Sequence, residues 1–123
     1  MPRLPLTSFL LPLALLAGCA TASGGGRVLV PGVPATMSVG DTVALPDAST
    51  LTYVGVTSDS RCPPNVQCIQ AGSAVLAFRH GGHEFTLETG KSTTTDLGAW
   101  RLTLVSLDFS EPPKATVRID AAR

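Results

Sequence analysis

Short runs of alternating apolar and polar residues, separated by turn residues, occupy the chain from Arg27 onward. This alternation is typical of strands that bury one face. It predicts strands within 27–30, 51–57, 74–79, 84–88, 100–109 and 115–120. No window carries a sustained helical period, so we expect no substantial helix.

Two turns are expected to join neighbouring strands as hairpins. The segments 37–39 and 43–45 alternate around a turn at Gly40-Asp41. Further along, two alternating runs are separated by Gly81-Gly82. Two glycines suit a two-residue hairpin turn, because both of its central positions need positive φ.

The apolar phase changes within 100–109, which looks like the longest strand. Trp100, Leu102 and Leu104 share one face, whereas Val105 and Leu107 share the other. Either both faces are covered or a bulge near Leu104-Val105 shifts the register. The polar segment 91–98 before it is expected to be a loop or a crossing between sheets.

About seven short strands with these spacings predict an all-β domain, an antiparallel β-sandwich, over residues 27–123. A small barrel is the alternative, but the sequence shows no barrel repeat. The length of 123 residues allows one such domain and not two.

The first eighteen residues have the features of a secretory signal peptide. Arg3 supplies a positive charge and residues 4–17 are apolar, too few for a membrane-spanning helix. The run ends in Leu16-Ala17-Gly18-Cys19. This quartet resembles the lipobox of bacterial lipoproteins. The resemblance implies removal of residues 1–18 and lipidation of Cys19, which would then begin the mature chain.

A lipid at Cys19 would place the protein on a membrane of the cell envelope. Stable attachment takes at least two acyl chains, which the diacylglyceryl group of this family, with its palmitate-type chains, supplies. Ala20 follows the cysteine where an aspartate would indicate a different destination. In a Gram-negative cell the resemblance therefore implies the outer membrane, facing the periplasm. Residues 19–26 are small and glycine-rich, typical of a flexible tether.

The other two cysteines, Cys62 and Cys68, enclose five residues in the middle of the chain. In an exported protein such a pair predicts a disulfide bond. The loop is expected either to be a structural staple alone or to serve also as a rigid recognition loop. Its candidate recognition residues are Arg61, Pro63, Pro64, Asn65, Val66 and Gln67.

The loop also carries a resemblance to other proteins. Asp59-Ser60-Arg61-Cys62-Pro63, followed by Val66-Gln67-Cys68 and Ala71-Gly72, is similar to the signature of a group of small, uncharacterised bacterial secreted or lipoprotein β-sandwiches. Gln70 stands where that group has an aromatic residue. The resemblance implies the location and fold, and no activity.

The chain carries few signals for chemistry. His80 and His83 flank the double glycine and would face each other, but two histidines are too few ligands for zinc, so they are only weak candidates for a metal site. There is no nucleophile elbow, zinc-protease motif or phosphate loop. We therefore expect a non-enzyme without a cofactor. The formal net charge of zero and the lack of a basic stripe argue against nucleic acid as a partner.

Three functions remain open after these exclusions. The first is a lipid-anchored binding or accessory module, for which Val66 and Ile69 should form an exposed apolar cluster. The second is a structural envelope lipoprotein without a specific ligand, for which the tip of the loop should be polar. The third is an inhibitor of a secreted hydrolase that presents the Cys62–Cys68 loop.

Overall fold

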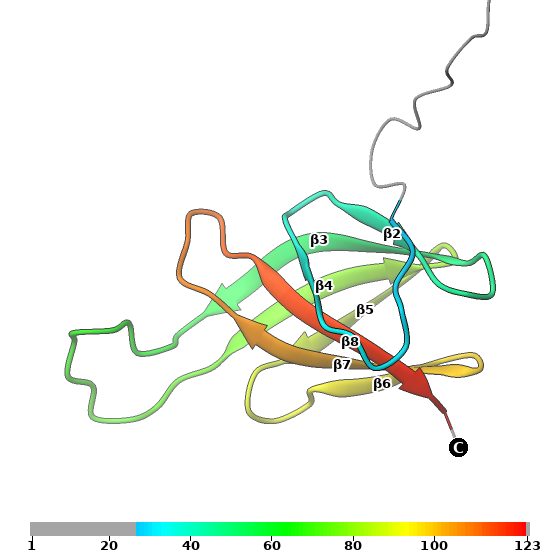
Figure 1. Cartoon of the computed structure of the whole chain (residues 1–123). Coiled ribbons are helices and arrows are strands. Elements are labelled where there is room, and N and C mark those ends of the chain that lie inside the picture. The colour runs from blue at the N-terminus through cyan, green and yellow to red at the C-terminus, as the bar shows by residue number, and fades with distance from the viewer. Residues whose placement is uncertain (1–26, 123) are drawn as a thin grey trace, which may run out of the picture.

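The computed structural model describes residues 27–122, which form eight strands in two layers (Figure 1). The predicted signal peptide (1–18), Cys19 and the tether (19–26) lie outside the described residues. The strands are β1 (Ala35–Met37), β2 (Thr42–Ala44), β3 (Thr50–Asp59), β4 (Ala74–His80), β5 (His83–Glu88), β6 (Thr94–Leu97), β7 (Trp100–Leu107) and β8 (Ala115–Ala121). Residues 27–122 offer no helix of the length and hydropathy that a membrane crossing requires.

Each layer is a four-stranded antiparallel sheet, so the predicted all-β sandwich is confirmed. One sheet has the order β1-β8-β7-β6 and the other the order β2-β3-β4-β5. Alternate side chains of both sheets meet in one apolar core, as the period of two along a strand requires. The largest fully buried side chains are Tyr53, Phe78, Met37, Leu45, Leu51, Leu76, Leu87, Leu102, Ile119, Val43 and Val117.

Two local predictions are confirmed. His80 pairs with His83 around Gly81 and Gly82, whose φ angles of 55° and 86° are those that favour glycine. In β7 the pairing with β8 shifts between Leu104 and Ser106, so the predicted bulge explains the change of apolar phase. The bulge lets both halves of β7 contribute to the core.

The predicted hairpin over 37–45 is wrong. Met37 in β1 pairs with β8, whereas Val43 in β2 pairs with β3 in the other sheet. The turn between them is therefore a crossing from one sheet to the other. It is held by the Asp41 carboxylate, which accepts a hydrogen bond from the Ser38 amide at 2.8 Å. The alternating pattern identified both strands, but alternation alone does not say which sheet a strand joins.

Three further details differ from the predictions. The segment 91–98 is only partly a loop, because Thr94–Leu97 forms β6, a strand whose Thr and Asp residues gave little apolar signal. Residues 27–30 contribute only one isolated bridge, from Val28 to Ala44. The longest strand is β3, with 10 residues against 8 in β7. The sandwich thus has eight strands rather than about seven.

Tyr53 fixes the arrangement at the end of the sandwich that carries the cysteine loop. It is fully buried in β3 and stacks on Phe78, with ring centroids 5.3 Å apart. Its hydroxyl donates a 2.9 Å hydrogen bond to the Pro113 carbonyl in the turn between β7 and β8. A strand of one sheet is thereby tied to a turn of the other.

Candidate functional site

The connection from β3 to β4, residues 60–73, projects well beyond the end of the two sheets (Figure 1). We call it the cysteine loop. Its two ends are joined at a neck made by Ser60 and Ser73. The Ser60 amide donates to the Ser73 carbonyl at 2.8 Å, and the Ser73 amide donates to Ser60 Oγ at 3.1 Å. The chains approach so closely here that a Cβ on Gly72 would overlap the Ser60 carbonyl. Only glycine fits this position without moving the neck.

Beyond the neck, Cys62 and Cys68 are joined by a disulfide bond, as predicted, with their Cα atoms 5.9 Å apart. The ring contains a tight turn, in which the Val66 amide donates to the Pro63 carbonyl at 3.3 Å. Asn65 has a φ of 68° in this turn. Proline followed by asparagine at positive φ is the sequence that a type II turn favours. The ring is therefore restrained both by its sulfurs and by its turn residues.

The side chain of Arg61 fastens the base of the loop to the opposite sheet. Its Nε and Nη2 donate to the two carboxylate oxygens of Asp59, at 3.0 and 2.8 Å. Its Nη1 donates to the Leu107 carbonyl at 2.7 Å, and its Nη2 donates to the Asp108 carbonyl at 2.9 Å. The guanidinium lies 4.0 Å from the centre of the Phe109 ring, a cation–π distance. Arg61 thus bridges β3 of one sheet and the end of β7 of the other.

These contacts separate Arg61 from the other candidate recognition residues. Its side chain is only 10% exposed, and its guanidinium is already hydrogen-bonded within the chain. Pro63, Pro64, Asn65, Val66 and Gln67 are all exposed. The structure therefore brings these five together on the outer part of the loop, and places Arg61 at its base.

Two carboxylates beside the base are held in their ionised form. The hydrogen bonds from Arg61 lower the pKa of Asp59 below its ordinary value. The pKa of Asp108 is also lowered, chiefly by the Ser110 hydroxyl and then by the Lys114 amide. A carboxylate with a lowered pKa is a poor proton donor at neutral pH. Their arrangement suits a structural role for both groups.

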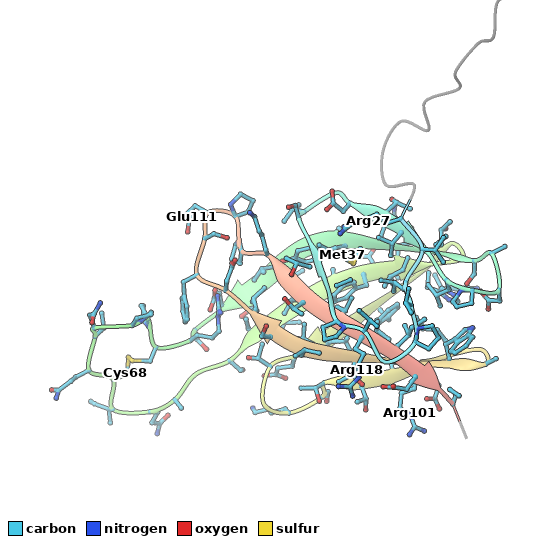
Figure 2. All side chains as sticks on the ribbon, in the orientation of Figure 1. Arg27, Met37, Cys68, Arg101, Glu111 and Arg118 are labelled. Atoms are coloured by element: carbon cyan, nitrogen blue, oxygen red, sulfur yellow. A yellow bond between two sulfur atoms is a disulfide. The ribbon has the colours of Figure 1, made fainter. Side chains whose placement is uncertain are left out.

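The tip of the loop carries no charge and exposes two aliphatic side chains among polar amides. Val66 is 54% exposed and Ile69 is fully exposed, at 103% of its reference area. No charged residue occurs between Cys62 and Ser73. Figure 2 shows Cys68 on the projecting part and Arg27, where the described chain begins, on the body of the sandwich. The uncharged tip therefore lies away from the point where the tether would join.

An open pocket of about 240 Å³ lies beside the base of the loop. We call it the end pocket. One wall is the second half of β7, with Leu104, Val105 and Leu107, and Phe109 and Arg61 extend this wall. The opposite side is formed by the segment 89–93 between β5 and β6. β6 pairs with Trp100–Thr103, and the Leu104 amide donates to the Thr93 carbonyl at 2.7 Å, so the pocket lies where this pairing of β7 ends.

Comparison of the chain with protein-family models, with curated proteins and with solved structures gives no match. The interpretation of the loop and the pocket therefore depends on their own chemistry.

The histidines lie at the hairpin tip between β4 and β5. His80 Nε2 is 2.9 Å from Ser49 Oγ, and this hydroxyl donates to the Asp47 carboxylate at 2.6 Å. In a catalytic triad the imidazole lies between the serine and the carboxylate, and it takes the serine proton. Here the serine lies in the middle and its proton is held by the carboxylate. Among the described residues, no group of three or more His, Cys, Asp or Glu side chains is placed to hold a metal ion.

Sequence reasoning missed the contribution of 104–109 to the site. Asp59 and Arg61 are two positions apart and form an ion pair at 2.8 Å. The acceptors at Leu107 and Asp108 lie 46 and 47 positions further along the chain. No local pattern links them to Arg61. The change of phase near Leu104 indicated an irregular strand, but it gave no sign of a pocket there.

Proposed function

We propose that this chain is a lipid-anchored protein of the bacterial cell envelope that binds another envelope protein through the cysteine loop. The observation that carries the proposal is the uncharged loop tip, which exposes Val66 within the disulfide ring and Ile69 directly after it. Large apolar side chains that project singly from a surface gain free energy when a partner buries them, at roughly 25 cal/mol per Å².

The restraints on the loop favour binding. A flexible loop loses conformational entropy when a partner fixes it, at roughly 0.5–1.5 kcal/mol for each immobilised side chain. The disulfide, the Pro63–Val66 turn and the Arg61 clamp have already fixed most of this loop in the free protein. More of the contact energy is then available for affinity.

The lipobox resemblance supplies the location. Lipidation at Cys19 would leave eight residues, 19–26, before the described domain. At roughly 3.3–3.6 Å per residue, they reach at most about 30 Å. The domain would therefore work close to its membrane, and a partner would have to lie within that layer.

Two other functions are weighed against this one. A purely structural lipoprotein is disfavoured, because its loop tip would be polar, whereas Ile69 is fully exposed. An inhibitor of a secreted hydrolase is favoured by the same preformed ring, since a rigid loop can enter a cleft at low entropic cost. Failure of the purified protein to inhibit a broad panel of secreted hydrolases would remove that candidate.

Site-directed crosslinking in cells tests the proposal. A photo-crosslinking amino acid replaces Val66 in the full chain, and a control chain carries it at Val33, which is 52% exposed but lies outside the loop. We expect a discrete crosslinked product from position 66 in which the partner is a protein other than this chain; the product should be absent from position 33 and lost when Ile69→Ser is added. Equal products from both positions, or none, would contradict loop-mediated binding.

The anchor is tested separately by mass spectrometry of the protein extracted from membranes. We expect an amino terminus at Cys19 carrying a diacylglyceryl group, and release of the protein from membranes by Cys19→Ser. An unprocessed amino terminus would overturn the proposed location and leave the crosslinking result to stand alone.

A further inference from the structure

The loop tip and the end pocket have complementary chemistry on the same end of the molecule. Ile69 is a fully exposed aliphatic side chain. The end pocket, of about 240 Å³, exposes more apolar than polar surface, contributed by Leu104, Val105, Leu107 and Phe109, and is completed by Arg61, Ser106 and the segment 89–93. An aliphatic group of the size of the Ile69 side chain fits a pocket of this volume and lining.

The loop is not arranged to fill the pocket of its own chain. The ring is closed by the disulfide, and its base is fixed by Arg61, which itself lines the pocket. Figure 1 shows the loop extending away from the end of the sheets and not folding back over β7. Each chain therefore presents an apolar projection and an apolar pocket that it leaves open.

The charges at this end permit a second copy as the occupant. Identical surfaces that meet across a two-fold axis bring like charges together, and like charges oppose association. The loop from Cys62 to Ser73 carries no charge. Arg61, the charged residue of the pocket, is paired with Asp59 at 2.8 Å. The loop and the pocket lining therefore bring no unpaired charge to the contact, and Lys91 beside the pocket is paired with Glu88 at 3.7 Å.

We propose that two copies of this chain pair end to end, with Ile69 of each copy in the end pocket of the other. A two-fold contact of this kind uses the same two patches twice, so it closes as a dimer and does not propagate. The inference goes beyond the proposed function and does not depend on the lipid anchor. Because both contacts use Ile69, the dimer and the envelope-protein complex would compete for this side chain. Because the contact is small, we expect a dissociation constant weaker than about 1 µM.

Sedimentation equilibrium of residues 27–123, which hold all eight strands and the core, tests the pairing. We expect a reversible monomer–dimer equilibrium between about 1 µM and 1 mM, the range expected of a small interface. Burial of one aliphatic side chain contributes roughly tenfold to an association constant, and the dimer contains two such contacts. Ile69→Ser should therefore weaken the dimer about a hundredfold. Val33→Ser, at an exposed position outside the loop, is the matched control and should leave it unchanged.

A pair of charge variants identifies the contact. Ile69→Lys and Val105→Glu both change exposed positions, so each variant should keep its fold, which circular dichroism can confirm. Each should be monomeric alone. Mixed together they should form a heterodimer, because one contact is then native and the other joins lysine to glutamate.

The proposal is overturned if the native domain is monomeric at about 1 mM, if Ile69→Ser dimerises like the native chain, or if the two charge variants fail to pair when mixed. Any of these results would leave the proposed binding of another envelope protein untouched. Conversely, loss of the crosslink at Val66 to other proteins would leave the dimer in place. The two ideas are therefore distinguishable.

Discussion

Replacement of Arg61 by lysine should loosen the attachment of the cysteine loop and destabilise the domain. Lysine keeps the positive charge and can still approach Asp59. It lacks the planar fork that donates at once to a carboxylate and to carbonyls. Of the four hydrogen bonds from Nε, Nη1 and Nη2, those to the Leu107 and Asp108 carbonyls should be lost, together with most of the cation–π contact to Phe109.

The size of the effect follows from these contacts. Each lost hydrogen bond from the charged group is worth about 1–1.5 kcal/mol net, because the donor side is only 10% exposed and the carbonyls regain some water. Loss of the cation–π contact adds roughly 0.5 kcal/mol, since Phe109 is half exposed. The sum is about 2.5–3.5 kcal/mol, a large share of the ~5–15 kcal/mol of a typical domain.

Urea unfolding followed by the fluorescence of Trp100 measures this change. With a slope of about 1–2 kcal/mol per molar, the midpoint should fall by about 1.2–3.5 M for Arg61→Lys. Arg101→Lys is the control, because Arg101 pairs only with Asp96 on an exposed surface. A midpoint for Arg61→Lys within about 0.3 M of the native value would refute the idea that the Arg61 guanidinium holds the cysteine loop to the opposite sheet.

Three further predictions concern the same end of the molecule. The pKa of Asp59 is lower in the folded protein than in the unfolded chain, so the stability that this carboxylate contributes is present above its unfolded pKa and is lost as pH falls through its folded pKa. Asp59→Asn should therefore flatten the acid side of a plot of unfolding free energy against pH, and an unchanged slope would contradict the assignment. Gly72→Ala should displace the neck, because its Cβ would overlap the Ser60 carbonyl, and should cost about 1–3 kcal/mol in urea unfolding; a loss below about 0.5 kcal/mol would show that the neck is not tight. Burial raises the pKa of Tyr53, which is the one tyrosine of the chain, so absorbance titration should place its ionisation above the ordinary value near 10; ionisation at or below that value while the protein remains folded would contradict its burial.

Much of the fold was predictable because it depends on neighbours in the sequence. The two-residue turn at Gly81-Gly82 depends on backbone freedom at two adjacent positions. The bulge in β7 is visible in the sequence because the apolar residues move from one face of the strand to the other. The disulfide was predictable because two cysteines lie six positions apart in a chain whose first residues have the features of a secretory signal. In each case the information needed lies within a few residues.

The predictions that failed concern features that depend on contacts between segments far apart in the sequence. The assignment of 35–37 and 42–44 to different sheets is decided by β8 and β3, which lie elsewhere in the chain. β6 was missed because its Thr-Thr-Asp-Leu sequence has little apolar content of its own, and its position comes from pairing with β7. The same is true of the site: the acceptors for Arg61 and the walls of the end pocket come from β7, for which the loop sequence contains no sign.

The closed ring has a consequence for redesign. The hydrogen bonds that fix it lie at the neck or run within the ring, from the Val66 amide to the Pro63 carbonyl. The exposed side chains of Val66 and Gln67 take part in none of these hydrogen bonds, whereas Asn65 has the positive φ that the turn needs. Positions 66 and 67 can therefore be changed while the turn and the sandwich beneath stay the same. A display library randomised there would offer new binding specificities on one small scaffold, with the geometry of the insert already set by its two sulfurs.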